Sequence, residues 1–137
     1  MVAPKLLEIG PELDDRIVGL RKSKGLIIDD CKEILSTHKF LMDTFYELTG
    51  LEKRSLASKY LHFHCPEKFF IYDSRARTGI GKLVKKSGKE LLKNVPDYDL
   101  EYGDFVCRMI ELQEYLDEQL GVYELPRKLD SFLLTAV

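Results

Sequence analysis

The segment from Arg54 to Thr78 contains two of the three histidines and several other side chains that could do chemistry. His62 and Lys59 are three residues apart, which places them on one face if the segment is helical. Asp73 follows shortly after them. A histidine, a carboxylate and a lysine in one pocket could perform acid–base work on a phosphodiester or a glycosidic bond. We therefore take Asp73, His62 and Lys59 as candidate catalytic residues.

The same residues also have a simpler structural interpretation. Asp73 stands where the N-cap of the following helix belongs, because its side-chain oxygen can accept from a free backbone amide of the first turn. His62 and Lys59 would then lie on a solvated helix face. On this interpretation the protein is not an enzyme. The alternative is an enzyme that acts on nucleic acid through Asp73 and His62.

The sequence predicts no metal site and no cofactor. His62, His64 and Cys65 are adjacent potential ligands, but side chains two apart on a helix point about 200° away from each other. The three cysteines include Cys31 and Cys107 and show no C-x-x-C spacing. We therefore expect three free thiols.

The charge is strongly polarised along the chain, although the net charge is only −2. Residues 53–89 contain 10 Lys/Arg and 2 Asp/Glu, a net charge of +8. Residues 97–120 contain 1 basic and 8 acidic residues, a net charge of −7. The candidate nucleic-acid-binding residues of the basic segment are Arg75, Arg77, Lys82, Lys85, Lys86 and Lys89.

This polarity leads to two hypotheses about partners. A basic face that stays open would bind the phosphates of nucleic acid weakly and with little sequence preference. The turn Gly79-Ile80-Gly81-Lys82 fits this hypothesis, because free amides at such a turn can bind phosphate. A basic segment covered by the acidic helix 97–120 would instead favour self-association as a homodimer, or a protein partner.

The apolar spacing predicts an all-α fold, a single domain over residues 1–137 with six or seven helices in a compact bundle. Pro11 is expected as the first residue of the first helix. The next helix would begin with a capping box at Asp30 and Glu33 and end at Gly50. His38 lies within its apolar stripe, so we expect a core histidine with one satisfied nitrogen.

The central helix is predicted to end near Cys65, because the residue before Pro66 disfavours helical geometry. A buried extended link, 69–72, follows. A long helix is expected from Asp99 to a stop at Gly121. The residues expected to face the core from the central helix are Leu56, Ala57, Tyr60, Leu61 and His64, with Ser55, Ser58, Lys59 and His62 on the other face.

Composition favours a cytoplasmic protein with no membrane partner. The sequence is 45% hydrophobic and 32% charged, and no apolar run reaches the roughly 18 residues that a membrane helix needs. The first ten residues show no signal-peptide pattern.

Two resemblances add to these expectations. The motifs R-S-x-A-S-K-Y-L-H-F-H-x-P and I-Y-D-S-R-A resemble those of a group of uncharacterised small bacterial proteins, which implies a common fold and no activity. The chain is also faintly similar to helix-hairpin-helix DNA glycosylases, with Leu48 to Leu51 at the hairpin and Asp73 at the catalytic aspartate. Glu52 replaces the second hairpin glycine. This similarity implies a related helical fold.

Overall fold

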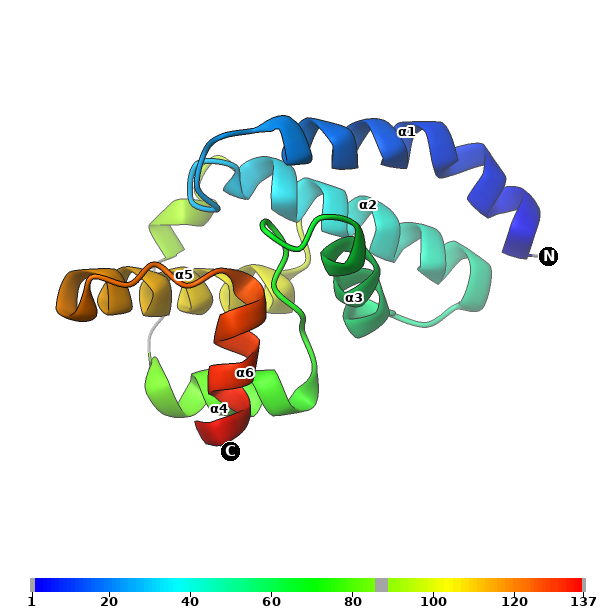
Figure 1. The fold of residues 1–137 in the computed structure, drawn as a ribbon. Coiled ribbons are helices and arrows are strands. Elements are labelled where there is room, and N and C mark those ends of the chain that lie inside the picture. Colours follow the sequence, from blue (N-terminus) through cyan, green and yellow to red (C-terminus); the bar gives the residue numbers. More distant parts are fainter. Residues whose placement is uncertain (1, 86–88, 137) are drawn as a thin grey trace.

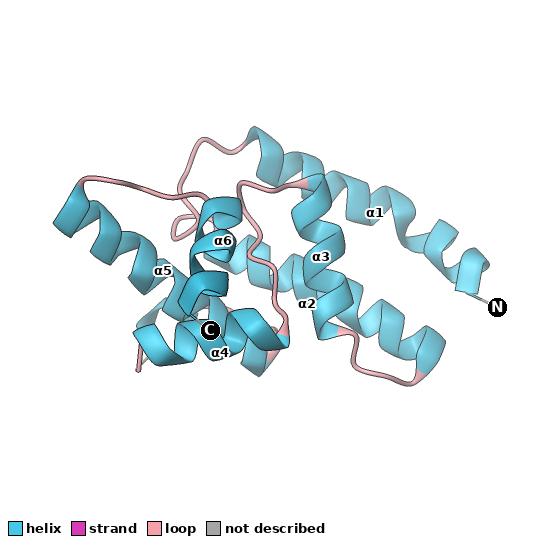
Figure 2. Cartoon of the chain, turned by 60° about the horizontal axis from the view of Figure 1, so that its bottom comes forward, coloured by secondary structure: helices cyan, strands magenta, loops and turns pink. Residues whose placement is uncertain are grey.

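The computed structural model describes the backbone of residues 2–85 and 89–136, and the side chains of residues 8–85, 90–131 and 133. Within these ranges the chain forms six α-helices, one short 3-10 helix and no strand, which confirms the predicted all-α fold (Figure 1, Figure 2). The elements are α1 (Val2–Lys22), α2 (Cys31–Thr49), α3 (Arg54–His64), α4 (Ser74–Leu83), η1 (Lys89–Leu92), α5 (Leu100–Leu120) and α6 (Pro126–Ala136).

The helices pack in two groups. The helices α1 and α2 lie side by side along one edge of the molecule, and α3 packs against α2 (Figure 1). At the opposite edge α6 crosses α4, and α4 also packs against α5. The core between them takes buried apolar side chains from every α-helix, among them Leu13, Ile17, Ile34, Leu35, Leu41, Leu61, Ile80, Tyr102, Phe105, Met109, Leu129 and Leu133.

A stacked pair of rings lies at the centre of this core. His38 and Tyr102 are both 0% exposed, and their ring centroids are 3.8 Å apart with an interplanar angle of 14°. His38 Nε2 lies 3.2 Å from the carbonyl oxygen of Arg54, whereas its Nδ1 has no hydrogen-bond partner in the described part of the protein. The prediction of a core histidine with one satisfied nitrogen is confirmed.

The link at 69–72 is extended and largely buried, as predicted. Because it pairs with no strand, its backbone groups need side-chain partners. Ser58 Oγ accepts from the amide of Tyr72 at 2.8 Å, and the Tyr102 hydroxyl donates to the carbonyl of Phe70 at 2.7 Å. The carbonyl of Phe69 lies 2.7 Å from His62 Nδ1.

The prediction of which α3 residues face the core is wrong in part. Ala57 and Leu61 are buried, but Leu56 is 50% and Tyr60 38% exposed, while Ser58 is 0% exposed. The helix is rotated about its axis relative to the apolar pattern. The physical reason is the link, because Ser58 must turn inward to satisfy a buried amide.

The predicted start of the first helix is also wrong. Pro11 lies inside α1, which already begins at Val2. A proline clashes with the Cβ of the residue before it when that residue is helical. Gly10 has no Cβ, which removes this clash at the residue before the proline.

The predicted capping box at Asp30 does not form. The Asp30 carboxylate makes no cap hydrogen bond; it accepts from Lys68 Nζ at 2.7 Å and from the Ser23 hydroxyl at 2.6 Å. The bond to Lys68 carries charge on both partners, whereas a cap bond to a backbone amide carries charge on the carboxylate alone. Gly50 and Gly121 end α2 and α5 as predicted, with left-handed φ values of 70° and 66°.

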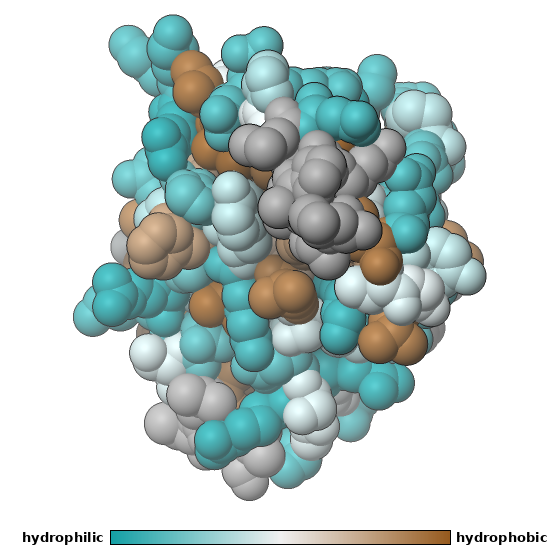
Figure 3. All heavy atoms as spheres, turned by 90° about the vertical axis from the view of Figure 1, so that its right-hand side faces the viewer, coloured by the Kyte–Doolittle hydropathy of each residue, from teal (hydrophilic) through white to brown (hydrophobic). Residues whose placement is uncertain are grey.

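The surface carries a few exposed apolar side chains. On the face shown in Figure 3, hydrophobic residues stand in small groups among hydrophilic ones. On α3, Leu56, Tyr60 and Phe63 are exposed, with Phe63 at 81%. No described helix has both the length and the apolar character needed to cross a membrane.

Candidate functional site

The basic residues of α4 lie on its solvent side. Asp73 caps the helix, since its Oδ1 accepts from the amide of Ala76 at 2.8 Å, and this confirms the predicted N-cap. Arg75 and Lys82 are seven residues apart, two turns along one stripe, and both are exposed. Arg77 and Lys85 are also exposed. Lys86 and the side chain of Lys89 lie outside the described residues.

These exposed cations make no ion pair with any other described residue. Elsewhere five arginine and lysine side chains bind carboxylates of the same chain, while other exposed cations such as Lys22, Lys24 and Lys32 are also without an ion pair among the described residues. The pairs are Arg16–Glu12, Lys39–Asp43, Arg54–Asp99, Lys68–Asp30 and Arg108–Asp104.

The strongest of these pairs attaches the acidic helix to α3. Arg54 donates through Nε and Nη2 to the two oxygens of Asp99, at 2.5 and 2.8 Å. Burial alone would raise the pKa of Asp99, but hydrogen bonds from Arg54 and from the amide of Tyr102 lower it. Glu101 lies 3.3 Å from Arg54 Nη1 and accepts from the Tyr72 hydroxyl at 2.8 Å. The carboxylates at the start of α5 are therefore engaged by Arg54 and Tyr72, and not by the cations of α4.

The candidate catalytic residues share one electrostatic neighbour. The carboxyl of Asp130, on α6, is close enough to Asp73, His62 and Lys59 to sense their charges. Burial raises the pKa of Asp130 and the charge of Asp73 raises it further, while His62 and Lys59 act in the opposite direction. Two carboxyls in unlike environments, beside a histidine, are an arrangement that acid–base chemistry uses.

The orientation of His62 follows from its hydrogen bond. A carbonyl oxygen can only accept, so Nδ1 donates to Phe69 and the neutral ring keeps Nε2 as an acceptor. Asp130 was missed by the sequence reasoning. No spacing connects it with Asp73, because only the packing of α6 on α4 brings them together.

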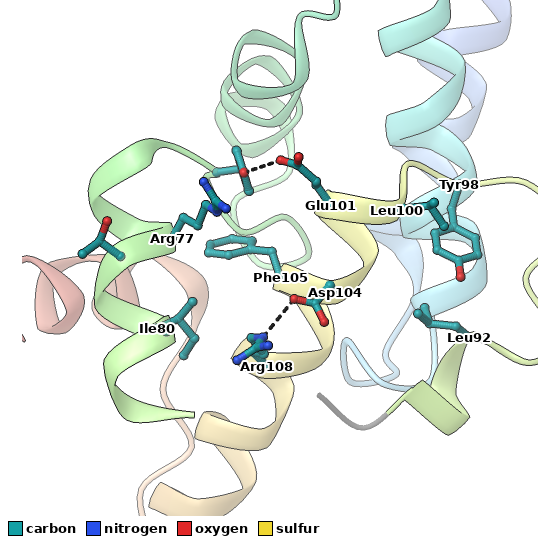
Figure 4. Close-up of a pocket in the computed structure, with 12 residues that line it drawn as sticks. Arg77, Ile80, Leu92, Tyr98, Leu100, Glu101, Asp104, Phe105 and Arg108 are labelled. Atoms are coloured by element: carbon teal, nitrogen blue, oxygen red, sulfur yellow. Dashed lines mark hydrogen bonds and ion pairs between the residues drawn. The ribbon is translucent and has the colours of Figure 1, made fainter. Parts of the chain in front are cut away.

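A cleft of about 700 Å³ lies between α4 and α5. Figure 4 shows Arg77 and Ile80 of α4 and Phe105 and Arg108 of α5 directed into the space between the two helices. From there the cavity extends around the start of α5 to Leu92, Tyr98 and Leu100.

The described residues include no group of three histidine, cysteine, aspartate or glutamate side chains placed to hold a metal ion. Cys31, Cys65 and Cys107 are free and buried, as predicted.

No family model, curated protein or solved structure matches the chain. The resemblances drawn from the sequence therefore stay expectations, and the functional inference rests on the geometry around α4.

Proposed function

We propose that this protein binds nucleic acid through a basic face made of Arg75, Arg77, Lys82 and Lys85. The observation that carries the proposal is that these four cations are exposed and unpaired within the described residues. A cluster of unpaired cations attracts polyanions over several ångströms, and its field is not cancelled locally.

The position of the acidic helix supports this proposal over self-association. The acidic segment would favour self-association if its carboxylates covered the basic segment. At the start of α5, Asp99 and Glu101 bind Arg54, and Asp104 binds Arg108 of the same helix. The basic face of α4 is left for an external anion. Arg127 and Lys128, in the first turn of the adjoining helix α6, are also exposed.

Binding of this kind is weak, and its affinity depends on the salt concentration. Phosphate contacts release counterions, so we expect non-specific dissociation constants of roughly 10⁻⁴–10⁻⁶ M at physiological salt, with affinity falling steeply as salt rises. Little sequence preference is expected, because phosphate contacts carry no base information.

The test replaces Arg75, Lys82 and Lys85 together with glutamate and measures fluorescence anisotropy of labelled DNA and RNA across a salt series. Binding should be lost while the helical circular dichroism spectrum is kept, since exposed side chains contribute little to stability. The matched control replaces Lys22, Lys24 and Lys32 with glutamate, because these lysines are equally exposed and lie at the opposite edge of the molecule. Equal loss in both variants, or no binding by the unaltered protein near 50 mM salt, contradicts the proposal.

A second candidate function is acid–base catalysis on the bound nucleic acid. The observation that favours it is that Asp130 lies within electrostatic range of Asp73, His62 and Lys59, with its pKa raised by burial and by Asp73. Asp130 would donate a proton to a leaving group, and Nε2 of His62 would accept one from water. Incubation with labelled oligonucleotides tests this function, and Asp130→Asn should abolish any strand cleavage or base release. Cleavage that survives Asp130→Asn and His62→Gln contradicts this assignment.

A further inference from the structure

The cleft between α4 and α5 adjoins the proposed basic face. Arg77 is shared by the two, because its guanidinium belongs to the basic residues of α4 and also lines the cavity. On a helical wheel Arg77 and Gly81 lie together on the side of α4 that turns toward α5, while Arg75 and Lys82 lie at the other border of its solvent side, with Ser74 and Thr78 between. A ligand that crosses the solvent side of α4 from Arg75 to Arg77 therefore reaches the mouth of the cleft.

The lining combines an apolar floor with polar walls. Ile80 and Phe105 are 1% and 2% exposed and form the floor between the helices (Figure 4). Arg108 and Asp104 stand beside it, joined at 2.9 Å. Arg108 also donates to the carbonyl of Val84, which ties the end of α4 to α5 and keeps the cleft walls in place.

The aromatic ring of Tyr98 lines the far end of the cleft. Tyr98 is partly buried and packs against Gly103, where a Cβ would lie 2.7 Å from two of the ring carbons. Glycine at this position lets the ring come this close to α5. The cleft thus presents aromatic and aliphatic surface together with guanidinium and carboxylate groups, in a volume typical of small-molecule sites.

We propose that this cleft takes one unpaired nucleotide of a single strand, with its base in the cleft and its phosphate at Arg77; the proposal rests on the proposed nucleic-acid binding. A nucleobase has apolar faces and an edge of donors and acceptors, which match the floor and the charged walls. A base in a duplex is stacked and paired, and it cannot enter without being extruded. Single-stranded nucleic acid is therefore the preferred ligand.

The experiment fills the cleft without altering charge. Gly81 lines the cavity, and a Cβ there meets nothing within 4 Å, so Gly81→Leu extends into open space and also favours the helix. Gly19→Leu is the matched control, since Gly19 is an exposed helical glycine on α1 whose Cβ would also meet nothing within 4 Å. Anisotropy is measured with a single strand, a duplex of the same sequence, and a single strand of abasic sites.

The unaltered protein should bind the single strand about tenfold more tightly than the duplex or the abasic strand, the size of one stacked base. Gly81→Leu should remove this preference and leave the affinity for the duplex unchanged. Gly19→Leu should keep both the preference and the duplex affinity. Equal affinity for the three ligands, or a preference that Gly81→Leu leaves unchanged, overturns the cleft assignment while the basic face stands. Absence of binding to every ligand at low salt overturns the proposed function, and the cleft assignment with it.

Discussion

At the scale of single residues, His38 has the most unusual environment. It is fully buried, stacked on Tyr102, and one ring nitrogen has no partner among the described residues. Burial lowers its pKa from 6.5 to about 4, against a smaller opposing effect of its hydrogen bond to Arg54. The ring is therefore neutral in the native protein at pH 7.

This low pKa predicts a pH-dependent stability. Above about pH 6.5 the ring is neutral in both the folded and the unfolded chain, so it has no effect. As the pH falls from about 6.5 to about 4, the unfolded chain gains a proton that the native state excludes, and the free energy of unfolding falls by on the order of 3 kcal/mol. Urea unfolding at a series of pH values measures the decrease. His38→Phe should flatten it between pH 6.5 and 5, and an unchanged slope in that variant would show that other groups cause it.

Asp73 supports a second prediction at this scale, because its carboxylate caps α4. Asp73→Ala should lower the free energy of unfolding by about 0.5–2 kcal/mol, and Asp73→Ser should restore most of it, since serine also accepts from the first-turn amides. Urea unfolding provides the measurement. If Asp73→Ser restores stability but removes an activity that the unaltered protein shows, then Asp73 acts in catalysis as well as in capping. Equal losses in the two variants would contradict the capping role.

At the scale of elements, the main polar connection between α3 and the start of α5 is the ion pair of Arg54 and Asp99. Asp99 is 9% exposed; it caps α5 through the amide of Tyr102 and binds Arg54 of α3 in a bidentate manner. The same side chain therefore begins one helix and positions another.

Removal of this carboxylate should be costly. Asp99→Ala leaves Arg54 without its main partner and α5 without its cap, and we expect a loss of about 3 kcal/mol or more. Asp99→Asn keeps an oxygen for the amide of Tyr102 and should lose less. Thermal and urea unfolding of the two variants give the comparison. Similar losses would mean that the charge, and not the cap, dominates; a negligible loss in both would exclude the pair as a structural link.

At the scale of the whole molecule, the open basic face predicts that the protein is monomeric without nucleic acid. The exposed carboxylates Glu114, Asp117 and Glu118 lie toward the C-terminal end of α5, and a second copy could reach the cations of α4 by pairing these two regions. Sedimentation at about 50 and 200 mM salt measures the species present. A dimer that dissociates as salt rises, and that the glutamate variant of α4 does not form, would favour self-association over nucleic-acid binding.

The sequence by itself determined the helices, most of their ends and the buried position of His38. These depend on local patterns: the spacing of apolar residues, the cap at Asp73 and the glycines at 50 and 121, whose left-handed conformation ends a helix. It also showed the concentration of positive charge in residues 53–89. Each of these features is encoded within a few turns of chain.

Only the tertiary structure decided which cations stay open and which groups meet. The sequence could not show that Arg54 binds Asp99 or that α3 turns Ser58 inward. In each case a buried polar group or charge requires a partner from a distant segment, because it has lost its water. Folding brings the partner close in three dimensions, so the requirement leaves no periodic pattern in the sequence.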